Sequence, residues 1–290
     1  MGPKKAKEIF PQLSERDIKY CAVFYEAQHN DSRTNIAIAM SAAEYGAHIA
    51  NYVEMTGVIS EKDSEKVIGI KALDRTTNES FSIYSKKIVF ACGPFTDDVR
   101  EIEHTQHSNK PMKRFVSGAA GTHVVLPGYY CPNDMGLLDY NTTDGRFLFF
   151  LPWENHTLVG TTDIKCKAES SPHAPEDEVQ WILNECGKYL SPDLRVRRSD
   201  VLSAWRGWRP LAIDPSKEND DTVSRDHVIS QNPKTGIVFV AGGKWTTWRE
   251  MAEEVIDEVL GEQTKGLCQT LDITLFGGDD CKFTNTLDFP

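Results

Sequence analysis

The sequence predicts a mixed α/β (α+β) fold in which α/β segments at both ends enclose an antiparallel sheet. Three observations lead to this prediction. Near the start of the chain, a helix ends on glycine and leads into a strand, which is typical of a β-α-β unit. In the middle, short apolar strands are separated by Gly, Asp and Asn turns, as in antiparallel sheets. Near the end, a buried strand meets two glycines and a helix follows.

The first third of the chain is expected to alternate between strands and helices. Residues 35–45 are rich in Ala and Met, and Gly46 follows where a helix C′ glycine belongs. A second helix is expected to begin near Pro94, after a Cys-Gly-Pro turn. The strands expected in this part cover residues 18–26, 48–55, 67–73, 81–84 and 87–91.

The rest of the chain contains two clear helix signals. Residues 175–190 carry three acidic side chains in the first turn, where they complement the helix dipole. Residues 248–260 follow the apolar strand 237–241 and are expected to form the other helix. Beyond residue 261 the sequence has no strong periodicity. The strands of the middle sheet are expected at residues 122–127, 146–151 and 156–160.

Composition narrows the class of protein. With 40% hydrophobic and 26% charged residues, the chain is expected to be globular, with one large or two ordinary domains. Its net charge of −11 disfavours a nucleic-acid role. No apolar run approaches the roughly 20 residues that a bilayer-spanning helix needs. The seven cysteines are scattered without a C-x-x-C pair, which argues against a zinc site or a disulfide framework, and we expect no metal.

The turn after strand 237–241 is the first candidate site. The glycines at 242–243 let the backbone approach a flat or anionic ligand closely, and the next helix N-terminus offers N–H groups and a positive dipole end. Lys244 stands at this turn, and one of the threonines at 246–247 is expected to cap the helix. A plain strand-turn-helix explains the same residues. A P-loop is excluded, because Trp245 occupies the Ser/Thr position of that motif.

Three basic residues in the C-terminal part, Arg209, Arg225 and Lys244, are candidates for binding an anion. Arginines on tight turns suit bidentate recognition of phosphate or carboxylate, although surface ion pairs explain any one of them. His123 lies on an expected strand, where a histidine is more often a core group than a catalyst. The small residues at 91–93 end another strand, which is a weak signal for a bound cofactor.

Eight blocks of sequence, taken in order, resemble one family. They are D-S-R-T-N at 31–35, G-P-F at 93–95, T-H-V-V-L-P at 122–127, D-G-R-F-L-F-F-L-P-W at 144–153, G-T-T-D at 160–163, S-A-W-R-G-W-R-P-L-A at 203–212, S-R-D-H at 224–227 and A-G-G-K-W-T-T-W-R at 241–249. The chain resembles the quinone-linked, FAD-dependent glycerol-3-phosphate dehydrogenases, in particular the mitochondrial type, from about residue 3 to about residue 262.

The resemblance implies a partial FAD-binding Rossmann-like domain with an inserted antiparallel substrate sheet, as in the amino-acid-oxidase-like flavoproteins. Residues 1–95 would form the second part of the FAD-binding domain together with strands of the substrate sheet. Residues 96–205 would form the antiparallel substrate domain, residues 206–262 would return to the FAD-binding domain, and residues 263–290 would begin a C-terminal helical domain.

The implied activity is oxidation of sn-glycerol 3-phosphate to dihydroxyacetone phosphate, with hydride transfer to FAD and electrons passed to ubiquinone. Catalytic roles would fall to His123 as the base and to Arg209 near the reacting carbon, and Arg225, Lys244 and Arg209 would bind substrate. A mitochondrial location with peripheral contact to the inner membrane is also implied. The implied cofactor-binding residues are Met55, Ala91, Gly93, Gly242, Gly243, Lys244, Thr246 and Thr247.

The sequence also departs from the family pattern. It contains no G-x-G-x-x-G motif for the FAD pyrophosphate, and we expect that both ends of a full-length member are missing. Arg206 and Trp208 replace smaller residues, and Trp248 stands where Tyr is usual. Two alternatives stay open. One is another FAD-dependent amino-acid or 2-hydroxy-acid oxidoreductase, and the other is a catalytically incomplete fragment.

Overall fold

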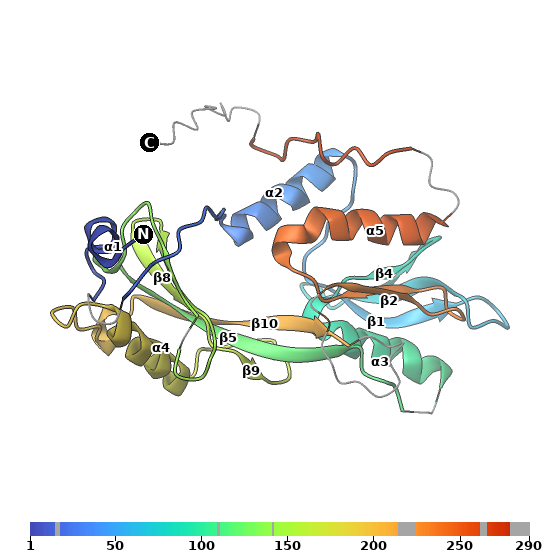
Figure 1. Ribbon diagram of the computed structural model, residues 1–290. Helices are drawn as coiled ribbons and strands as arrows, with labels where there is room; N and C mark the ends of the chain where they lie inside the picture. Colours follow the sequence, from blue (N-terminus) through green and yellow to red (C-terminus); the bar gives the residue numbers. More distant parts are fainter. Residues whose placement is uncertain are drawn as a thin grey trace. The chain divides into compact units, whose positions relative to one another are not determined.

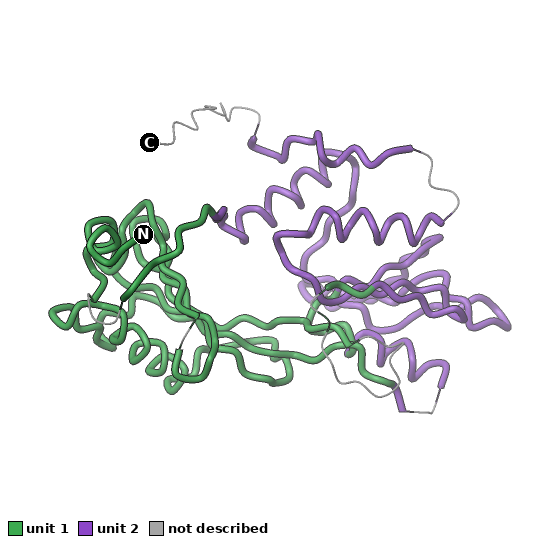
Figure 2. Tube along the Cα trace, in the orientation of Figure 1, with its two compact units in different colours: residues 1–25, 92–97, 113–228 green, residues 26–91, 98–112, 229–290 purple. Residues whose placement is uncertain are grey.

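The computed structural model describes residues 1–14, 18–108, 111–140, 142–213, 224, 226–261 and 266–278. The chain forms two compact units, and each is assembled from several separate stretches (Figure 2). Unit 1 contains Met1–Tyr25, Cys92–Asp97 and Lys113–Val228, and unit 2 contains Glu26–Ala91, Asp98–Met112 and Ile229–Pro290. Our division at residues 95, 205 and 262 stays a prediction.

Unit 1 is built on a six-stranded antiparallel sheet (Figure 1). Four strands pair in the order β10-β5-β8-β7, β6 follows β7, and β9 pairs with β5. Strands β7 and β8 are joined by Glu154 and Asn155, whose φ angles of 47° and 64° suit a tight two-residue hairpin. The strands are β5 (Val116–Pro127), β6 (Leu137–Asp139), β7 (Leu148–Trp153), β8 (His156–Gly160), β9 (Ile164–Lys165) and β10 (Ser203–Ala212).

One face of this sheet is covered by α4 (Glu176–Tyr189). The helix presents Val179 and Ile182, both almost fully buried, to Val124, Leu126 and neighbouring strands. Side chains alternate between the two faces of a strand. The odd-numbered residues of β5 and β10 therefore point to the opposite side, which we call the far face. A short helix, α1 (Pro3–Ile9), packs through Ala6 and nearby apolar residues in a separate small cluster.

Unit 2 contains an antiparallel meander and a small mixed sheet (Figure 1). The meander runs β1-β2-β3, and the second sheet has the order β11-β12-β4, with β12 parallel to β4. These elements are β1 (Val53–Ser60), β2 (Val67–Asp74), β3 (Ser80–Tyr84), β4 (Val89–Phe90), β11 (Val228–Gln231), β12 (Val238–Ala241), α2 (Asp31–Glu44), α3 (Thr96–His107) and α5 (Trp248–Leu260).

Strand β12 is packed on both faces. Val238 and Val240 contact α5 on one side. On the other side, the Phe239 ring lies 5.3 Å from the Phe90 ring, and Arg100 of α3 lies 5.4 Å above it. A strand buried on both faces explains why 237–241 is a continuous apolar run. In the described part of the chain, none of the helices is long and apolar enough to cross a membrane.

Most of the expected elements are confirmed. The helix expected over 248–260 is α5, that over 175–190 is α4, and the meander strands lie where they were expected. The strand expected over 18–26 is wrong, because this stretch has no β-pairing in the described structure. The expected strand 48–55 is displaced, since β1 begins only at Val53. The described tail, 266–278, contains no helix or strand.

Candidate functional site

His123 occupies a narrow slot on the far face of the unit 1 sheet. It lies on β5, directly opposite Trp205 of β10 and Gly160 of β8. The imidazole stacks on the Trp205 indole, with ring centroids 5.4 Å apart and planes 8° from parallel. On the other side, a Cβ built on Gly160 would come within 2.8 Å of the imidazole Cγ. The glycine therefore leaves the space that the ring occupies.

Arg209 lies on the same face, four residues further along β10. Its guanidinium sits over Gly121, where a Cβ would lie only 2.5 Å from Nη2. Nη1 donates to Asp163 Oδ1 at 3.0 Å, and Nη2 donates to Thr161 Oγ1 at 3.0 Å. Because Gly121 is two positions from His123 on β5, the cation and the imidazole are near neighbours on one surface. An anion bound here would accept hydrogen bonds from the same guanidinium that already donates to the Asp163 carboxylate.

A buried polar cluster supports these strands from the α4 side. The carboxylate of Glu178, only 4% exposed, forms an ion pair with Arg206 at 2.8 Å. It also accepts hydrogen bonds from Thr122 and Thr162 at 2.6 and 2.5 Å. This cluster ties α4 to β5 and β10, the two strands that carry His123 and Arg209. Sequence reasoning noted Arg206 only as a departure from the family pattern and did not find its partner.

In unit 2, the predicted glycine turn follows β12. Gly242 and Gly243 have φ angles of 83° and 74°, in the left-handed region that favours glycine. A short 3-10 helix, η4 (Trp245–Thr247), then leads into α5. Thr247 occupies the N-cap position of α5, but its hydroxyl donates to Lys244 O at 3.0 Å and makes no side-chain cap bond. Capping by Thr247 is therefore not observed, and no side-chain oxygen of the N-cap residue accepts from the N–H groups at the start of α5.

Lys244 and Thr246 are exposed at this turn, and no ion pair among the described residues includes Lys244. Strand β4 is parallel to β12 and ends just before Ala91, so Ala91 and the glycine turn lie at the same edge of the sheet. Gly93 follows two residues later with a φ of 53° and starts a 3-10 turn, η1 (Gly93–Phe95). The structure thus brings Ala91 and the glycine turn together within unit 2.

Two predicted site residues stand apart from these groups. Met55 lies on β1 of the meander, which is a different sheet from β4 and β12. Arg225 lies outside the described residues. The described residues contain no group of three or more His, Cys, Asp or Glu side chains that could hold a metal ion. The functional roles of all the predicted site residues stay predictions.

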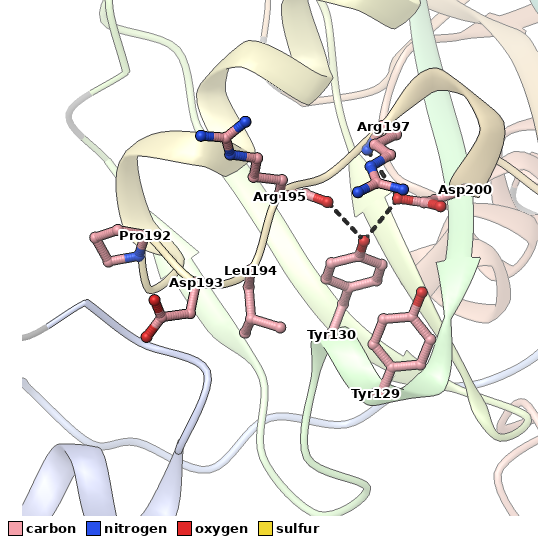
Figure 3. A pocket seen from close by; sticks show the side chains of 8 residues that line it. All are labelled: Tyr129, Tyr130, Pro192, Asp193, Leu194, Arg195, Arg197 and Asp200. Atoms are coloured by element: carbon pink, nitrogen blue, oxygen red, sulfur yellow. Dashed lines mark hydrogen bonds between the residues drawn. The ribbon is translucent and has the colours of Figure 1, made fainter.

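A separate cavity of about 510 Å³ opens elsewhere in unit 1 and contains none of the predicted site residues (Figure 3). Tyr130 lines it and donates its hydroxyl to Asp200 Oδ2 at 2.8 Å. Burial, together with the neighbouring Asp200 carboxylate, raises the pKa of Tyr130 well above its usual value. The hydroxyl therefore stays a hydrogen-bond donor, which suits a structural link between η2 (Gly128–Tyr130) and η3 (Arg198–Asp200).

Comparison with known families decides the assignment of the chain. The model of the family described as FAD dependent oxidoreductase matches residues 1–257. The chain belongs to this family. This FAD dependent oxidoreductase is 43% identical over 286 residues to the mitochondrial glycerol-3-phosphate dehydrogenase of Mesocricetus auratus. The aligned region covers 97% of the chain and 38% of the relative. The Homo sapiens protein of the same name is 41% identical, with the same coverage.

The chain therefore spans about 38% of the length of these curated relatives. Among solved structures, the glycerol-3-phosphate dehydrogenase of Bacillus halodurans complexed with FAD is 30% identical, with a TM-score of 0.83, over 96% of this chain and 52% of that one. Glycine oxidase from Geobacillus kaustophilus, at 17% identity and a TM-score of 0.62 over 95% of this chain and 65% of that one, shows the fold alone. The family resemblance and the predicted fold class are confirmed.

Proposed function

We propose that the chain is the core of an enzyme that oxidises sn-glycerol 3-phosphate to dihydroxyacetone phosphate. The observation that carries the proposal is that His123 and Arg209 lie on the same face of the sheet, in a chain 43% identical to a mitochondrial glycerol-3-phosphate dehydrogenase. An imidazole beside a fixed cation suits removal of a hydroxyl proton next to an anionic substrate. In this proposal His123 supplies the base and Arg209 the fixed cation.

The glycine turn in unit 2 fits the FAD of this family. Two consecutive left-handed glycines let the backbone approach a flat ring system, and α5 begins without a side-chain cap. When bound, FAD supplies the hydride acceptor for the oxidation. Gly242, Gly243 and Ala91 are the residues that would lie against it, and the positive end of the α5 dipole would favour added negative charge.

The roles of individual side chains follow from their chemistry. His123 would accept the proton of the C2 hydroxyl, and Arg209 would hold the oxygen on that carbon. Lys244, exposed and outside the described ion pairs, would anchor phosphate, and Arg225 is proposed for the same task. The proposed electron acceptor is ubiquinone, and the proposed location is the inner mitochondrial membrane as a peripheral protein. The resemblance and the names of the relatives support both.

Substrate screening tests this proposal. The purified protein, with FAD added in excess, is mixed anaerobically with glycerol 3-phosphate, glycine, sarcosine or 2-hydroxyglutarate, and bleaching of the flavin absorbance is followed. We expect bleaching with glycerol 3-phosphate, and reoxidation when a soluble ubiquinone analogue is added. Bleaching by an amino acid or a 2-hydroxy acid instead would transfer the chain to another activity of the family. Bound FAD that none of the four substrates bleaches would support an incomplete fragment.

A further inference from the structure

The imidazole of His123 is packed on both sides, more closely than a general base requires. Its ring lies against Trp205 on β10, and the backbone of Gly160 on β8 closes the opposite side. Both neighbours sit directly across from His123 in the strand register. The indole is nevertheless 41% exposed and takes no part in the apolar cluster beneath α4. Packing of the core therefore does not explain why a tryptophan stands here.

We propose that Trp205 is a positioning residue for His123: together with Gly160 it forms a slot that fixes the plane of the imidazole. The inference rests on the proposed role of His123 as base. Stacked aromatic rings favour a defined offset geometry, and an indole face also tolerates a cationic ring. Gly160 sets the depth of the slot, since a Cβ there would lie 2.9 Å from Nε2 and push the ring aside.

The chemical need for such a slot is one of alignment. A general base acts only when its nitrogen lies within hydrogen-bonding distance of the proton that it removes. A histidine at a strand surface has two rotatable bonds and otherwise samples several rotamers. The stack with Trp205 and the close backbone of Gly160 together restrict the imidazole of His123 to one orientation. Arg209 fills the space above Gly121, the neighbouring position on the same face of β5. Trp205 thus acts through His123 without touching substrate.

The same strand offers a matched control. Trp208 lies three residues from Trp205 on β10, but its side chain belongs to the opposite face, where its Nε1 donates to Glu169 O at 2.9 Å. Arg206 lies 5.2 Å above the Trp208 ring. Trp208→Leu therefore removes an indole of equal size from the same strand, and the Trp208 contacts described are with Glu169 and Arg206, not with His123 or Gly160.

The first test observes the slot itself. The protein contains eight histidines, and the Cε1–H resonance of His123 is assigned as the signal lost in His123→Asn. Ring current from a stacked indole shifts this resonance upfield. We expect Trp205→Leu to move it towards the position of exposed histidines, Trp205→Phe to keep part of the upfield shift, and Trp208→Leu to leave it in place. Gly160→Ala should displace it although Trp205 is retained.

The second test connects the slot with turnover of glycerol 3-phosphate in the presence of excess FAD. Trp205→Leu should lower kcat roughly tenfold, with KM within about twofold, because misplacement of a catalytic group by about 1 Å reduces the rate without removing substrate contacts. Trp205→Phe should recover most of the loss, and Trp208→Leu should stay within about twofold of the parent.

The outcomes separate this inference from the proposed function. An unchanged His123 resonance in Trp205→Leu overturns the slot, whatever the kinetics. Equal losses of kcat in Trp205→Leu and Trp208→Leu assign both tryptophans to general stability and also overturn the positioning role. If the parent protein does not oxidise glycerol 3-phosphate, the proposed function fails, while the resonance shifts still decide whether Trp205 and Gly160 hold the ring.

Discussion

At the scale of single residues, Lys244 is the strongest test of anion binding in unit 2. Its ammonium group is exposed and takes part in none of the described ion pairs, so a ligand can use its full charge. We expect Lys244→Ala to lower kcat/KM for glycerol 3-phosphate roughly tenfold or more, and to slow flavin reduction, since a lost contact to a charged group costs about 1.5–3 kcal/mol. Steady-state and single-turnover kinetics measure both.

Lys234→Ala is the matched control for Lys244→Ala, because Lys234 is an exposed lysine of unit 2 that pairs with Glu65 at 3.1 Å. It should leave the kinetics unchanged within about twofold. Were Lys244→Ala to behave like this control, Lys244 would have only a structural place at the start of η4, where its carbonyl accepts a hydrogen bond from Thr247.

Arg209 tests whether the site reads geometry as well as charge. Its guanidinium donates through two different nitrogens to Asp163 and Thr161, and the single ammonium nitrogen of a lysine lacks this planar fork. We expect Arg209→Lys and Arg225→Lys each to lower kcat/KM for glycerol 3-phosphate by about tenfold or more. Arg198→Lys, which changes an exposed pair with Glu176, should have little effect.

Unphosphorylated glycerol identifies which arginine contacts phosphate. It should be a very poor substrate of the parent protein, because phosphate binding energy would orient the reacting carbon. A substitution at a phosphate-binding arginine should then reduce turnover of glycerol much less than turnover of glycerol 3-phosphate. Losses of equal size on both substrates would mean that neither arginine contacts phosphate: Arg209 would then act at the C2 oxygen alone, as proposed, and Arg225 would belong to a structural ion pair.

At the scale of elements, Glu185 on α4 makes the stability of the fold depend on pH in the acid range. Burial alone would raise the pKa of Glu185, but hydrogen bonds from Lys188 and Thr143 outweigh it and hold that pKa below its usual value of 4.5. A carboxyl whose pKa is lower in the folded state stabilises the fold above the unfolded pKa. That contribution is lost as the pH falls from about 4.5 through the lower folded value.

We therefore expect Glu185→Gln to reduce the free energy of unfolding by roughly 1–3 kcal/mol at neutral pH, and by much less near pH 3. Urea unfolding at the two pH values measures the difference. Glu176→Gln on the same helix is the control, since the Glu176–Arg198 pair is exposed and should contribute about 0–1 kcal/mol. A penalty for Glu185→Gln that does not change with pH would contradict this account.

The elements also show what the sequence could predict. Helix α5 was predicted at its observed bounds, because helical periodicity and the preceding glycine turn are local signals. The strand expected over 18–26 fails for the opposite reason: a strand needs a partner, and apolar content does not supply one. Strand β1 begins later than expected, since its bounds are set by pairing with β2 from Val53↔Asp74 onwards.

The candidate site also contains features that local sequence signals predict and features that depend on strand pairing. The glycine pair after β12 was recognisable from sequence, and in the structure both glycines adopt a positive φ. The neighbours of His123 were not, because they depend on which strands pair and in which register. Trp205 is 82 residues away in sequence, yet the β5–β10 register places it directly opposite. Asp163 as the partner of Arg209 depends on the same register.

At the scale of the whole molecule, the sequence leads to a prediction about the affinity of the chain for FAD. The 290-residue sequence contains no G-x-G-x-x-G loop, the usual N–H cradle for two phosphates. We expect the chain to bind FAD weakly, to lose it on gel filtration, and to bind FMN nearly as well as FAD, since only the ring end would be held. Quenching of flavin fluorescence measures both affinities. A yellow protein with stoichiometric FAD after gel filtration would contradict this prediction.

Each unit is also discontinuous in sequence, with unit 2 assembled from three stretches that alternate with those of unit 1. The sheet of unit 1 is not complete until β10 has paired with β5, about 80 residues later in the chain. Neither unit can be isolated by a single cut, so variants of either one are best compared in the whole chain.

The buried pair of Arg206 and Glu178 limits which single substitutions the fold can accept. The family resemblance led us to expect a smaller residue at Arg206, and its cation neutralises a carboxylate that is 4% exposed. Replacement of Arg206 alone by a small residue would leave that buried charge unpaired, at a cost of roughly 3–5 kcal/mol. Replacement of both residues together would avoid leaving a buried charge unpaired. The two positions therefore depend on each other: the first single substitution leaves one buried charge unpaired, and only the second restores the balance.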